Sequence, residues 1–266
     1  MKLAFIGGGT MGEAIVSGAI ANNVADAEDV AVCDVAPARR EHLSSTYGVS
    51  VTESAAEAAS GTDLIVLAVK PQEFAGAAGG LKGSLTSDQT VMSIMAGVRI
   101  DTIVEVTGHA AIVRTMPNTP ATIGEGMTVW TATAAVADTA REFVRRLLSV
   151  LGKEADVDDE KYIDMATAVS GSGPAYVFLL IEALVEAAVE IGLDREMATR
   201  IVLQTVKGSA RYAEDSGVAP AALRDQVTSR GGTTEAALRE LDDAGVRPAF
   251  ARAVSAAYER AKELGG

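Results

Sequence analysis

The chain has 266 residues, enough for two domains or one large one, and 48% of them are hydrophobic, which is ample for a core. Its net charge of −13 argues against nucleic acid and anionic membranes as partners, because both bind basic surfaces. The single cysteine excludes an internal disulfide and a cysteine-based zinc site, and no apolar run approaches the ~18 residues of a membrane span.

The charge and the start of the chain also bear on where the protein works. A strand is predicted from the third residue, so we expect no signal peptide. Together with the single cysteine and the lack of a membrane-spanning run, this predicts a cytoplasmic protein, and we expect no metal site. Arginine outnumbers lysine on an acidic chain, a composition that suits high salt as well as ordinary solubility, and the sequence leaves that choice open.

The first predicted elements are a short strand, a glycine-rich turn and a helix. Residues 3–6 form an apolar run typical of a strand, and apolar residues recur at helical spacing from Met11. Between them, Gly7, Gly9 and Gly12 give the spacing G-x-G-x-x-G, which in this context indicates a dinucleotide-binding turn. The helix start offers free N–H groups and a partial positive charge to a pyrophosphate.

A second strand is predicted over residues 30–34 and ends at an acidic residue. Asp34 follows Gly12 by 22 residues, where a dinucleotide fold places a carboxylate on the adenosine ribose. A carboxylate there favours NAD because it repels a 2′-phosphate, yet Arg39 and Arg40 follow closely and could pair with that phosphate. The sequence therefore leaves the choice between NADH and NADPH open.

The remaining elements of the first half alternate between strands and helices. Strands are predicted over 49–51, 63–69, 90–94, 110–116, 127–131 and 153–157, and helices over 38–47 and 135–151. In a doubly wound sheet, ligands bind beyond the carboxyl ends of the strands, so residues 68–71 should line the cofactor crevice, with Pro71 starting the next helix. The pattern predicts an α/β, Rossmann-type doubly wound domain over residues 1–157.

Strand patterns vanish from residue 158 onward. Helices are predicted over 160–169, 175–191, 195–214, 220–225, 234–242 and 248–263, with an interruption at 170–174, Ser-Gly-Ser-Gly-Pro. The stretch 175–191 is apolar on nearly all sides, as in a helix buried in a core or against a partner. We therefore predict an all-α domain over residues 158–266 that serves as an oligomer interface.

Two loops carry site-like patterns. Residues 116–120, Met-Pro-Asn-Thr-Pro, form a rigid loop that serves either as a plain connection or as a wall of the nicotinamide pocket. Residues 227–234 end where a helix begins, with a bare Gly231-Gly232 backbone and Thr233 or Thr234 expected to cap the helix. Free N–H groups and hydroxyls at a helix start suit a carboxylate, although a plain capped helix has the same pattern.

Five motifs, in this order along nearly the whole chain, resemble pyrroline-5-carboxylate reductase, the last enzyme of proline biosynthesis. They are FIGGGTMGEAI, AVKPQ, MPNTPATIGEG, SGSGPAYVF and VTSRGGTT. The resemblance implies a Rossmann domain followed by an all-α dimerisation domain, and reduction of the small molecule 1-pyrroline-5-carboxylate to L-proline with NADPH or NADH. It also implies a homodimer, which in this family often assembles into a decamer of five dimers.

The resemblance assigns roles residue by residue. Besides Asp34, the cofactor-binding residues would be Ile6, Gly7, Gly9, Thr10, Met11, Ala68, Val69, Lys70, Pro71, Met95 and Ala96. The substrate-binding residues would be Val227, Ser229, Gly232, Thr233 and Thr234. Thr234 is the candidate for a hydrogen bond to the ring nitrogen and is therefore the predicted catalytic residue.

The chain departs from the family pattern at three places. Arg230 replaces a proline of the substrate loop, and we hypothesise that it is tolerated because it points to solvent. Ala55 stands where the family often has asparagine, and Asp34 where NADP-preferring members have a small polar residue. His42 and His109 are interpreted as surface residues of the first domain. We expect neither to be catalytic, because reduction of a protonated ring imine needs no strong base.

Two other functions share part of the pattern. A 3-hydroxyacid dehydrogenase pairs a helical-domain lysine with an asparagine one turn later, but here Lys161 is followed by Asp164 and Lys207 by Ala210. A non-catalytic dinucleotide sensor would keep the glycine motif and need no second glycine–threonine loop. Residues 227–234 therefore favour the reductase, or a related enzyme acting on another imine.

Overall fold

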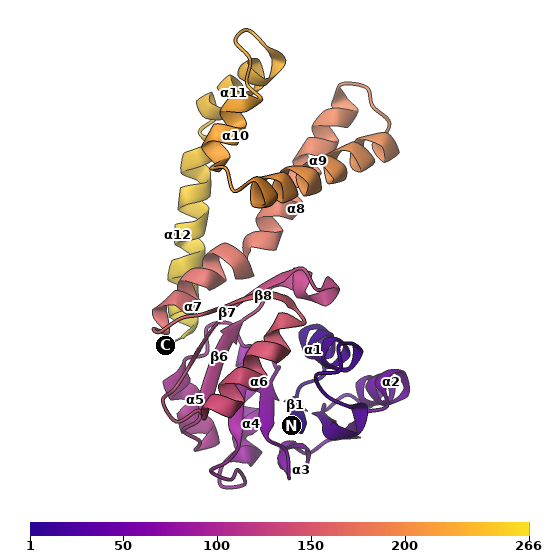
Figure 1. The fold of residues 1–266 in the computed structure, drawn as a ribbon, viewed down its shortest axis with the longest axis vertical. Helices are drawn as coiled ribbons and strands as arrows, with labels where there is room; N and C mark the ends of the chain where they lie inside the picture. The colour runs from indigo at the N-terminus through magenta and orange to yellow at the C-terminus, as the bar shows by residue number, and fades with distance from the viewer. Residues whose placement is uncertain (266) are drawn as a thin grey trace. The chain divides into compact units, whose positions relative to one another are not determined.

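The computed structural model describes residues 1–265 and divides into two compact units (Figure 1). The first unit comprises residues 1–172 together with residues 257–265 and is an α/β domain, and the second comprises residues 173–256 and is helical. The predicted fold class, a Rossmann-type sheet followed by a helical domain, is confirmed.

A single sheet forms the centre of the first unit (Figure 1). Its strands are β1 (Leu3–Ile6), β2 (Val30–Cys33), β3 (Ser50–Thr52), β4 (Leu64–Leu67), β5 (Thr90–Ser93), β6 (Ile112–Met116), β7 (Gly126–Ala132) and β8 (Gly152–Asp156). The order β3-β2-β1-β4-β5-β6 is parallel throughout and is that of dinucleotide-binding folds. β7 pairs with β6 antiparallel, and β8 runs parallel to β7.

Helices cover both faces of this sheet. α1 (Thr10–Ala21), α2 (Pro37–Tyr47) and α6 (Asp138–Ser149) pack on one face, and α3 (Ala55–Ala59), α4 (Phe74–Ala78) and α5 (Ile100–Thr107) on the other. Leu3 and Phe5 belong to the first core and Ala4 and Ile6 to the second, as alternate residues of a strand must. Burial on both faces explains why these strands are apolar without alternation.

Single turns of 3₁₀-helix fill several connections. They are η1 (Ala27–Asp29), η2 (Pro71–Glu73), η3 (Gly79–Leu81) and η4 (Thr119–Ile123). The prediction that Pro71 starts a helix is confirmed, because η2 begins there and continues into α4. The sequence did not predict α3 or α5: α3 has only five residues, and α5 is made mostly of β-branched residues that favour strands.

The second unit is built from α8 (Gly173–Glu190), α9 (Arg195–Ser216), α10 (Pro220–Gln226), α11 (Thr233–Asp243) and the first part of α12 (Val246–Leu264). Its own buried core is small and centres on Val185, Ala198 and Val202. Large apolar side chains of α8 are exposed, among them Phe178 and Leu179. The expectation that no apolar run approaches a membrane span is wrong by length and composition: the helical stretch over residues 161–190 meets that criterion, and little of it is buried.

The interruption predicted at residues 170–174 is a π-helical turn and a one-residue bend rather than a loop. The chain stays helical from α7 (Lys161–Ala166) through a π-helical turn, η5 (Thr167–Gly171), into α8. Within that turn the Ser172 N–H donates to the Thr167 carbonyl over 2.8 Å, five residues back. A Cβ at Gly171 would lie 2.5 Å from Met116 Cε, so the glycine serves close packing rather than a break in the helix.

The last turns of α12 belong to the first unit. Ala261 is buried, and a Cβ at Gly97 would lie 2.5 Å from Leu264 Cβ, so the end of the helix rests on a glycine that has φ of +75°. Contacts thus divide the chain after residue 172 and again before residue 257. The boundary expected from the sequence, 157/158, marks instead the point where β8 has ended and α7 follows.

Candidate active site

The glycine turn between β1 and α1 forms an open cradle. Gly7 has φ of +101°, and a Cβ there would lie 2.6 Å from the Ala68 carbonyl oxygen. A Cβ at Gly12 would lie 2.7 Å from the Gly7 carbonyl oxygen, whereas one at Gly9 would meet no atom within 4 Å. Gly9 is also the N-cap of α1, and no side chain caps that helix. The turn therefore leaves space and free N–H groups for a pyrophosphate, as the motif predicted.

A pocket of about 570 Å³ opens beside this turn at the carboxyl ends of β1 to β4. Seven of the predicted cofactor residues line it: Ile6, Gly7, Gly9, Asp34, Ala68, Val69 and Lys70. Six lining residues were not predicted: Cys33, Val35, Glu53, Glu73, Gly76 and Ala77. Glu53 directly follows β3, so the rule that ligands bind beyond strand ends could have identified it.

The other predicted cofactor residues do not line this pocket. Thr10 opens α1 and is exposed, and Met11 packs on the core beneath that helix. Pro71 opens η2. The Met95 side chain is buried in the second core and its N–H donates to the Ser93 hydroxyl over 3.2 Å, so Met95 could meet a ligand only through its backbone. Ala96 follows it in the turn after β5, half-buried, and these roles stay predictions.

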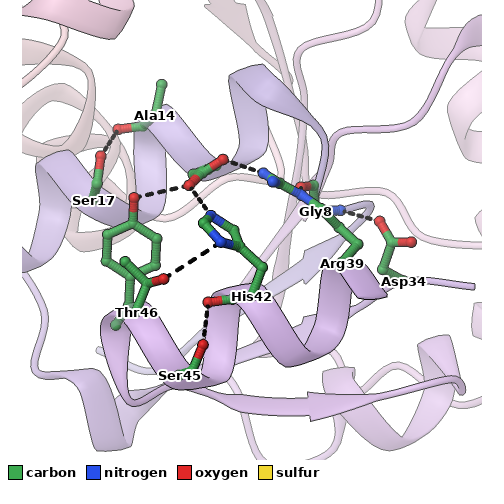
Figure 2. A network of polar contacts seen from close by, with 10 residues as sticks. Gly8, Ala14, Ser17, Asp34, Arg39, His42, Ser45 and Thr46 are labelled. Atoms are coloured by element: carbon green, nitrogen blue, oxygen red, sulfur yellow. Dashed lines mark hydrogen bonds and ion pairs between the residues drawn. The ribbon is translucent and has the colours of Figure 1, made fainter. Parts of the chain in front are cut away.

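Asp34 ties the end of β2 to the glycine turn. Its Oδ2 accepts a hydrogen bond from the Gly8 N–H over 2.8 Å, and its Oδ1 accepts one from the Ala36 N–H over 2.8 Å. Figure 2 shows the Asp34 carboxylate directed at Gly8. The carboxylate therefore stays in a fixed place on the wall of the pocket, where an adenosine ribose would lie in this fold.

Both arginines after Asp34 are held by carboxylates. Arg39 donates to the Gly8 carbonyl and forms an ion pair with Glu13, and Figure 2 shows its guanidinium beside Gly8. Arg40 donates to the Asp34 carbonyl over 2.7 Å and forms an ion pair with Glu53. Neither arginine is among the residues that line the pocket.

Glu13, in the first turn of α1, is the centre of a polar cluster with α2. Besides Arg39, it has His42 Nε2 at 2.8 Å, and it accepts a hydrogen bond from the Tyr47 hydroxyl over 2.9 Å. Burial acts to raise the pKa of Glu13, but the hydrogen bonds from Arg39, His42 and Tyr47 outweigh it and lower the pKa to about 2. The pKa of Tyr47 is raised, mainly by burial and secondly by the hydrogen bond to Glu13.

The two histidines occupy different environments. His42 is exposed, as predicted, and lies in the Glu13 cluster. The prediction that His109 is a surface residue is wrong, because its side chain is buried with Nε2 2.6 Å from the Gln89 carbonyl oxygen. Gln89 precedes β5, so His109 lies at the amino ends of the strands, opposite the edge that carries the pocket.

The loop at residues 116–120 is fixed by Asn118. Its Oδ1 accepts a hydrogen bond from the Met127 N–H over 2.9 Å at the start of β7, and its Nδ2 donates to the Ser170 hydroxyl over 3.1 Å in the π-helical turn. η4 follows directly, with Pro120 in its first turn. The loop is therefore a rigid connection, and its second interpretation, as a wall of the nicotinamide pocket, stays a prediction.

In the second unit, the predicted substrate loop joins α10 to α11. The expected capping by a threonine is wrong: Gly232 is the N-cap, and neither Thr233 nor Thr234 caps the helix with its side chain. Instead, the Gly231 N–H donates to Glu235 Oε2 over 2.7 Å. The two hydroxyls in the first turn of α11 thus have no capping role, which leaves them able to bind a ligand together with the helix N–H groups.

Apart from the half-buried Thr228, the residues of this loop that precede Gly231 are exposed within the single chain. They include Val227 and Ser229, whose carbonyl accepts a hydrogen bond from the Gly232 N–H over 3.0 Å. Arg230 is also exposed, as the hypothesis about its tolerance requires. Gly231 has φ of +71°, a conformation that a side chain disfavours.

Two protein families match the two parts of the chain. Residues 160–264 match a family described as pyrroline-5-carboxylate reductase dimerisation. Residues 2–97 match a family described as NADP oxidoreductase, coenzyme F420-dependent. The first match includes α8 and the substrate loop, and the second includes the glycine turn and the pocket.

Full-length relatives extend this result. The chain is 42% identical to pyrroline-5-carboxylate reductase of Synechocystis sp., covering 100% of this chain and 98% of the relative, and 39% identical to that of Pseudomonas aeruginosa, covering 99% and 96%. It is similar to the solved structures of pyrroline-5-carboxylate reductase from Coxiella burnetii (38% identity) and of pyrroline carboxylate reductase from Plasmodium falciparum with NADP bound (33% identity). Each has a TM-score of 0.91 and covers 100% of this chain and 98% of its own. The chain belongs to the pyrroline-5-carboxylate reductase family.

Proposed function

We propose that this chain reduces 1-pyrroline-5-carboxylate to L-proline with NADPH or NADH, the last step of proline biosynthesis. Family membership over the full length carries the proposal. Two features of the molecule support it: an open glycine cradle beside a pocket in the first unit, and two threonine hydroxyls with no capping role at the start of α11 in the second.

The chain's own residues have to hold two small reactants in a productive orientation. The nicotinamide, when bound, supplies a hydride to C5 of the protonated ring imine, whose nitrogen becomes the amine of proline. The N–H groups of Gly9 and Thr10 at the start of α1 would hold the pyrophosphate, and Asp34 would hold the adenosine ribose. The N–H groups at the start of α11, with Ser229 and Thr233, hold the substrate carboxylate.

Thr234 has the catalytic role in this proposal, as the hydrogen-bond partner of the ring nitrogen. No general base is required, because protonation of the imine already makes C5 electrophilic. In Thr234→Ala, kcat should fall about 10- to 100-fold, the cost of one hydrogen bond to a charged group, while the Kd of the reduced cofactor stays unchanged. Thr234→Ser, which keeps the hydroxyl, should restore most of the rate, and unchanged turnover in Thr234→Ala would remove Thr234 from the mechanism.

The experiment that tests the reaction is oxidation of NADH and of NADPH, each with and without 1-pyrroline-5-carboxylate, in low and in high salt. Loss of the reduced-nicotinamide absorbance that depends on the substrate supports the reductase. Tight cofactor binding without turnover in any salt would contradict it and favour a sensor, or an enzyme acting on another imine. In that case Arg230→Pro, which restores the family residue, shows whether the substrate loop is responsible.

Homo-oligomerisation follows from the match of residues 160–264 to a dimerisation family. The finer assembly that we propose is a homodimer that associates further into a decamer, in a soluble, cytoplasmic protein. The exposed apolar side chains of α8 support an interface between copies, because the matched dimerisation region contains that helix. A second copy of the chain therefore accounts for the apolar stretch 161–190 without a membrane.

A further inference from the structure

Carboxylates dominate the charge of the cofactor pocket. Asp34, Glu53 and Glu73 line it, and Lys70 is the one cation that does so within residues 1–265. NADH and NADPH differ only in the 2′-phosphate of the adenosine ribose, which adds about two negative charges. Because Asp34 lies at the end of β2, where the ribose binds in this fold, and has no ion-pair partner among the described residues, the extra phosphate would approach a like charge.

Cations that could offset this repulsion are close by but already engaged. Arg40, which does not line the pocket, is paired with Glu53 and also donates to the Asp34 carbonyl, so the charges of Arg40 and Glu53 offset each other. Arg39 is paired with Glu13, whose carboxylate is fixed by two further contacts, with His42 and with the Tyr47 hydroxyl. A phosphate would have to compete with a carboxylate for each guanidinium.

Of the two ion pairs, Arg39–Glu13 is the better one for testing cofactor choice, because Arg39 contacts the glycine turn next to Asp34. Gly8 donates its N–H to Asp34 and accepts a hydrogen bond from Arg39 at its carbonyl (Figure 2). The Asp34 carboxylate, beside which the ribose would bind, and the Arg39 guanidinium are therefore hydrogen-bonded to the same residue. Without the Glu13 charge, Arg39 would keep its bond to Gly8 and present an unpaired cation next to the ribose position.

We infer that this chain binds NADH in preference to NADPH, and that Glu13 is a specificity-determining residue because it engages the Arg39 guanidinium that would otherwise hold a 2′-phosphate. The inference rests on the proposed use of a reduced nicotinamide cofactor by this pocket. The relative from Plasmodium falciparum was solved with NADP bound, so the preference is inferred for this chain from its own acidic residues and is not extended to the family.

The test is direct titration of the full-length protein with NADH and with NADPH, following nicotinamide fluorescence at low salt. The wild type should bind NADH at least tenfold more tightly. Glu13→Gln should narrow this ratio at least threefold by tightening NADPH, with little change in NADH. Glu41→Gln is the matched control, because it removes the same charge from an exposed position of α2 that contacts neither Arg39 nor the pocket, and it should leave the ratio unchanged.

Equal or tighter binding of NADPH by the wild type would overturn the inference, as would a Glu13→Gln variant that weakens both cofactors equally or changes neither. If Glu13→Gln fails to fold, Glu53→Gln frees Arg40 in the same way and should also narrow the ratio. Raising the salt should reduce the wild-type preference, since the repulsion is electrostatic. Binding is read without substrate, so a failure of the proposed reaction leaves this result intact.

Discussion

At the scale of single residues, two threonines of neighbouring strands differ in one hydrogen bond. The hydroxyl of Thr128 on β7 is buried and has no partner among the residues that the structure describes. The hydroxyl of Thr115 on β6 is also buried, but it donates to the Ser93 carbonyl over 3.0 Å. A buried hydroxyl without a partner costs its desolvation, whereas a bonded one recovers that cost.

Thr128→Val should therefore stabilise the protein by about 1 kcal/mol, since valine has nearly the same shape and no hydroxyl to desolvate. The matched change Thr115→Val should destabilise it by about 1 to 3 kcal/mol, because the Ser93 carbonyl loses its donor. Urea unfolding with unchanged m-values measures both. A loss of stability in Thr128→Val similar to that in Thr115→Val would mean that the Thr128 hydroxyl has a partner in solution.

Glu13 gives a second prediction, on the pH dependence of stability. Its pKa is lowered from 4.5 to about 2, so its contribution to stability is complete above pH 4.5 and is lost as the pH falls towards 2. Because the side chain keeps 22% exposure, we expect a contribution of about 1 kcal/mol. The difference in unfolding free energy between wild type and Glu13→Gln should shrink between pH 5 and pH 3. A difference that stays constant over this range would show that Glu13 is not stabilised as an anion.

At the scale of elements, one buried ion cluster joins α5, β6 and α7. Arg114 of β6 is fully buried and pairs with Glu160 over 2.7 Å and with Asp164 of α7 over 2.6 Å. Glu160 also accepts a hydrogen bond from the Ile100 N–H over 2.7 Å at the start of α5. The Arg114 Nε has no partner within residues 1–265, so the two carboxylates provide the compensation for its charge. Removing one of them leaves a buried cation partly uncompensated.

Glu160→Gln should lower the free energy of unfolding by about 2 to 3 kcal/mol, because it removes the charge opposite Arg114. Glu142→Gln is its control: Glu142 is 62% exposed and lies 3.7 Å from Arg145, so its loss should cost less than about 0.5 kcal/mol. Thermal and urea unfolding of both variants measure the contrast. Equal effects would mean that the buried cluster contributes no more than a surface pair.

The elements that the sequence predicted well are those with a clear local pattern. The apolar runs of β1 and β4 reflect burial on both faces of the sheet, and α9 and α12 are long enough for helical spacing to be recognised. α3 has only five residues, fewer than the window of about 11 to 18 residues in which helical periodicity is recognised. The π-helical turn over 167–171 packs against Met116, which lies in another part of the chain. A local pattern cannot contain such a contact.

The features of the candidate site also divide into those that local sequence patterns predicted and those that depend on contacts between distant segments. Gly7, Asp34 and Ala68 were predictable because strand order and the glycine spacing place them at one edge of the sheet. The ion pairs Arg39–Glu13 and Arg40–Glu53 join segments that are distant in the sequence, so the sequence could only offer the arginines and Asp34 as competing alternatives. The missing capping role of Thr233 and Thr234 depends on the backbone of Gly232, which takes the N-cap position itself.

At the scale of the whole molecule, the exposed apolar side chains of α8 predict assembly. Phe178 is 60% exposed in the single chain, which is costly for a phenylalanine unless a second copy covers it. Phe178→Asp should weaken the homodimer, and light scattering during gel filtration should show a shift towards monomer with lower thermal stability. Ile123→Asp, at a position 77% exposed in the first unit, should leave the mass unchanged. An unaltered mass for Phe178→Asp would place the interface elsewhere.

The return of α12 to the first unit has a consequence for the order of synthesis. Residues 1–172 leave the ribosome early, but the place beside Gly97 that Leu264 fills stays vacant until residues 257–265 have followed. The α/β unit is thus begun first and completed last, with the whole second unit translated in between. A nascent chain stalled at residue 256 should hold a sheet that is assembled yet still sensitive to protease around Gly97. Release of the last turns of α12 should remove that sensitivity, so the first unit closes only after the second unit has been translated.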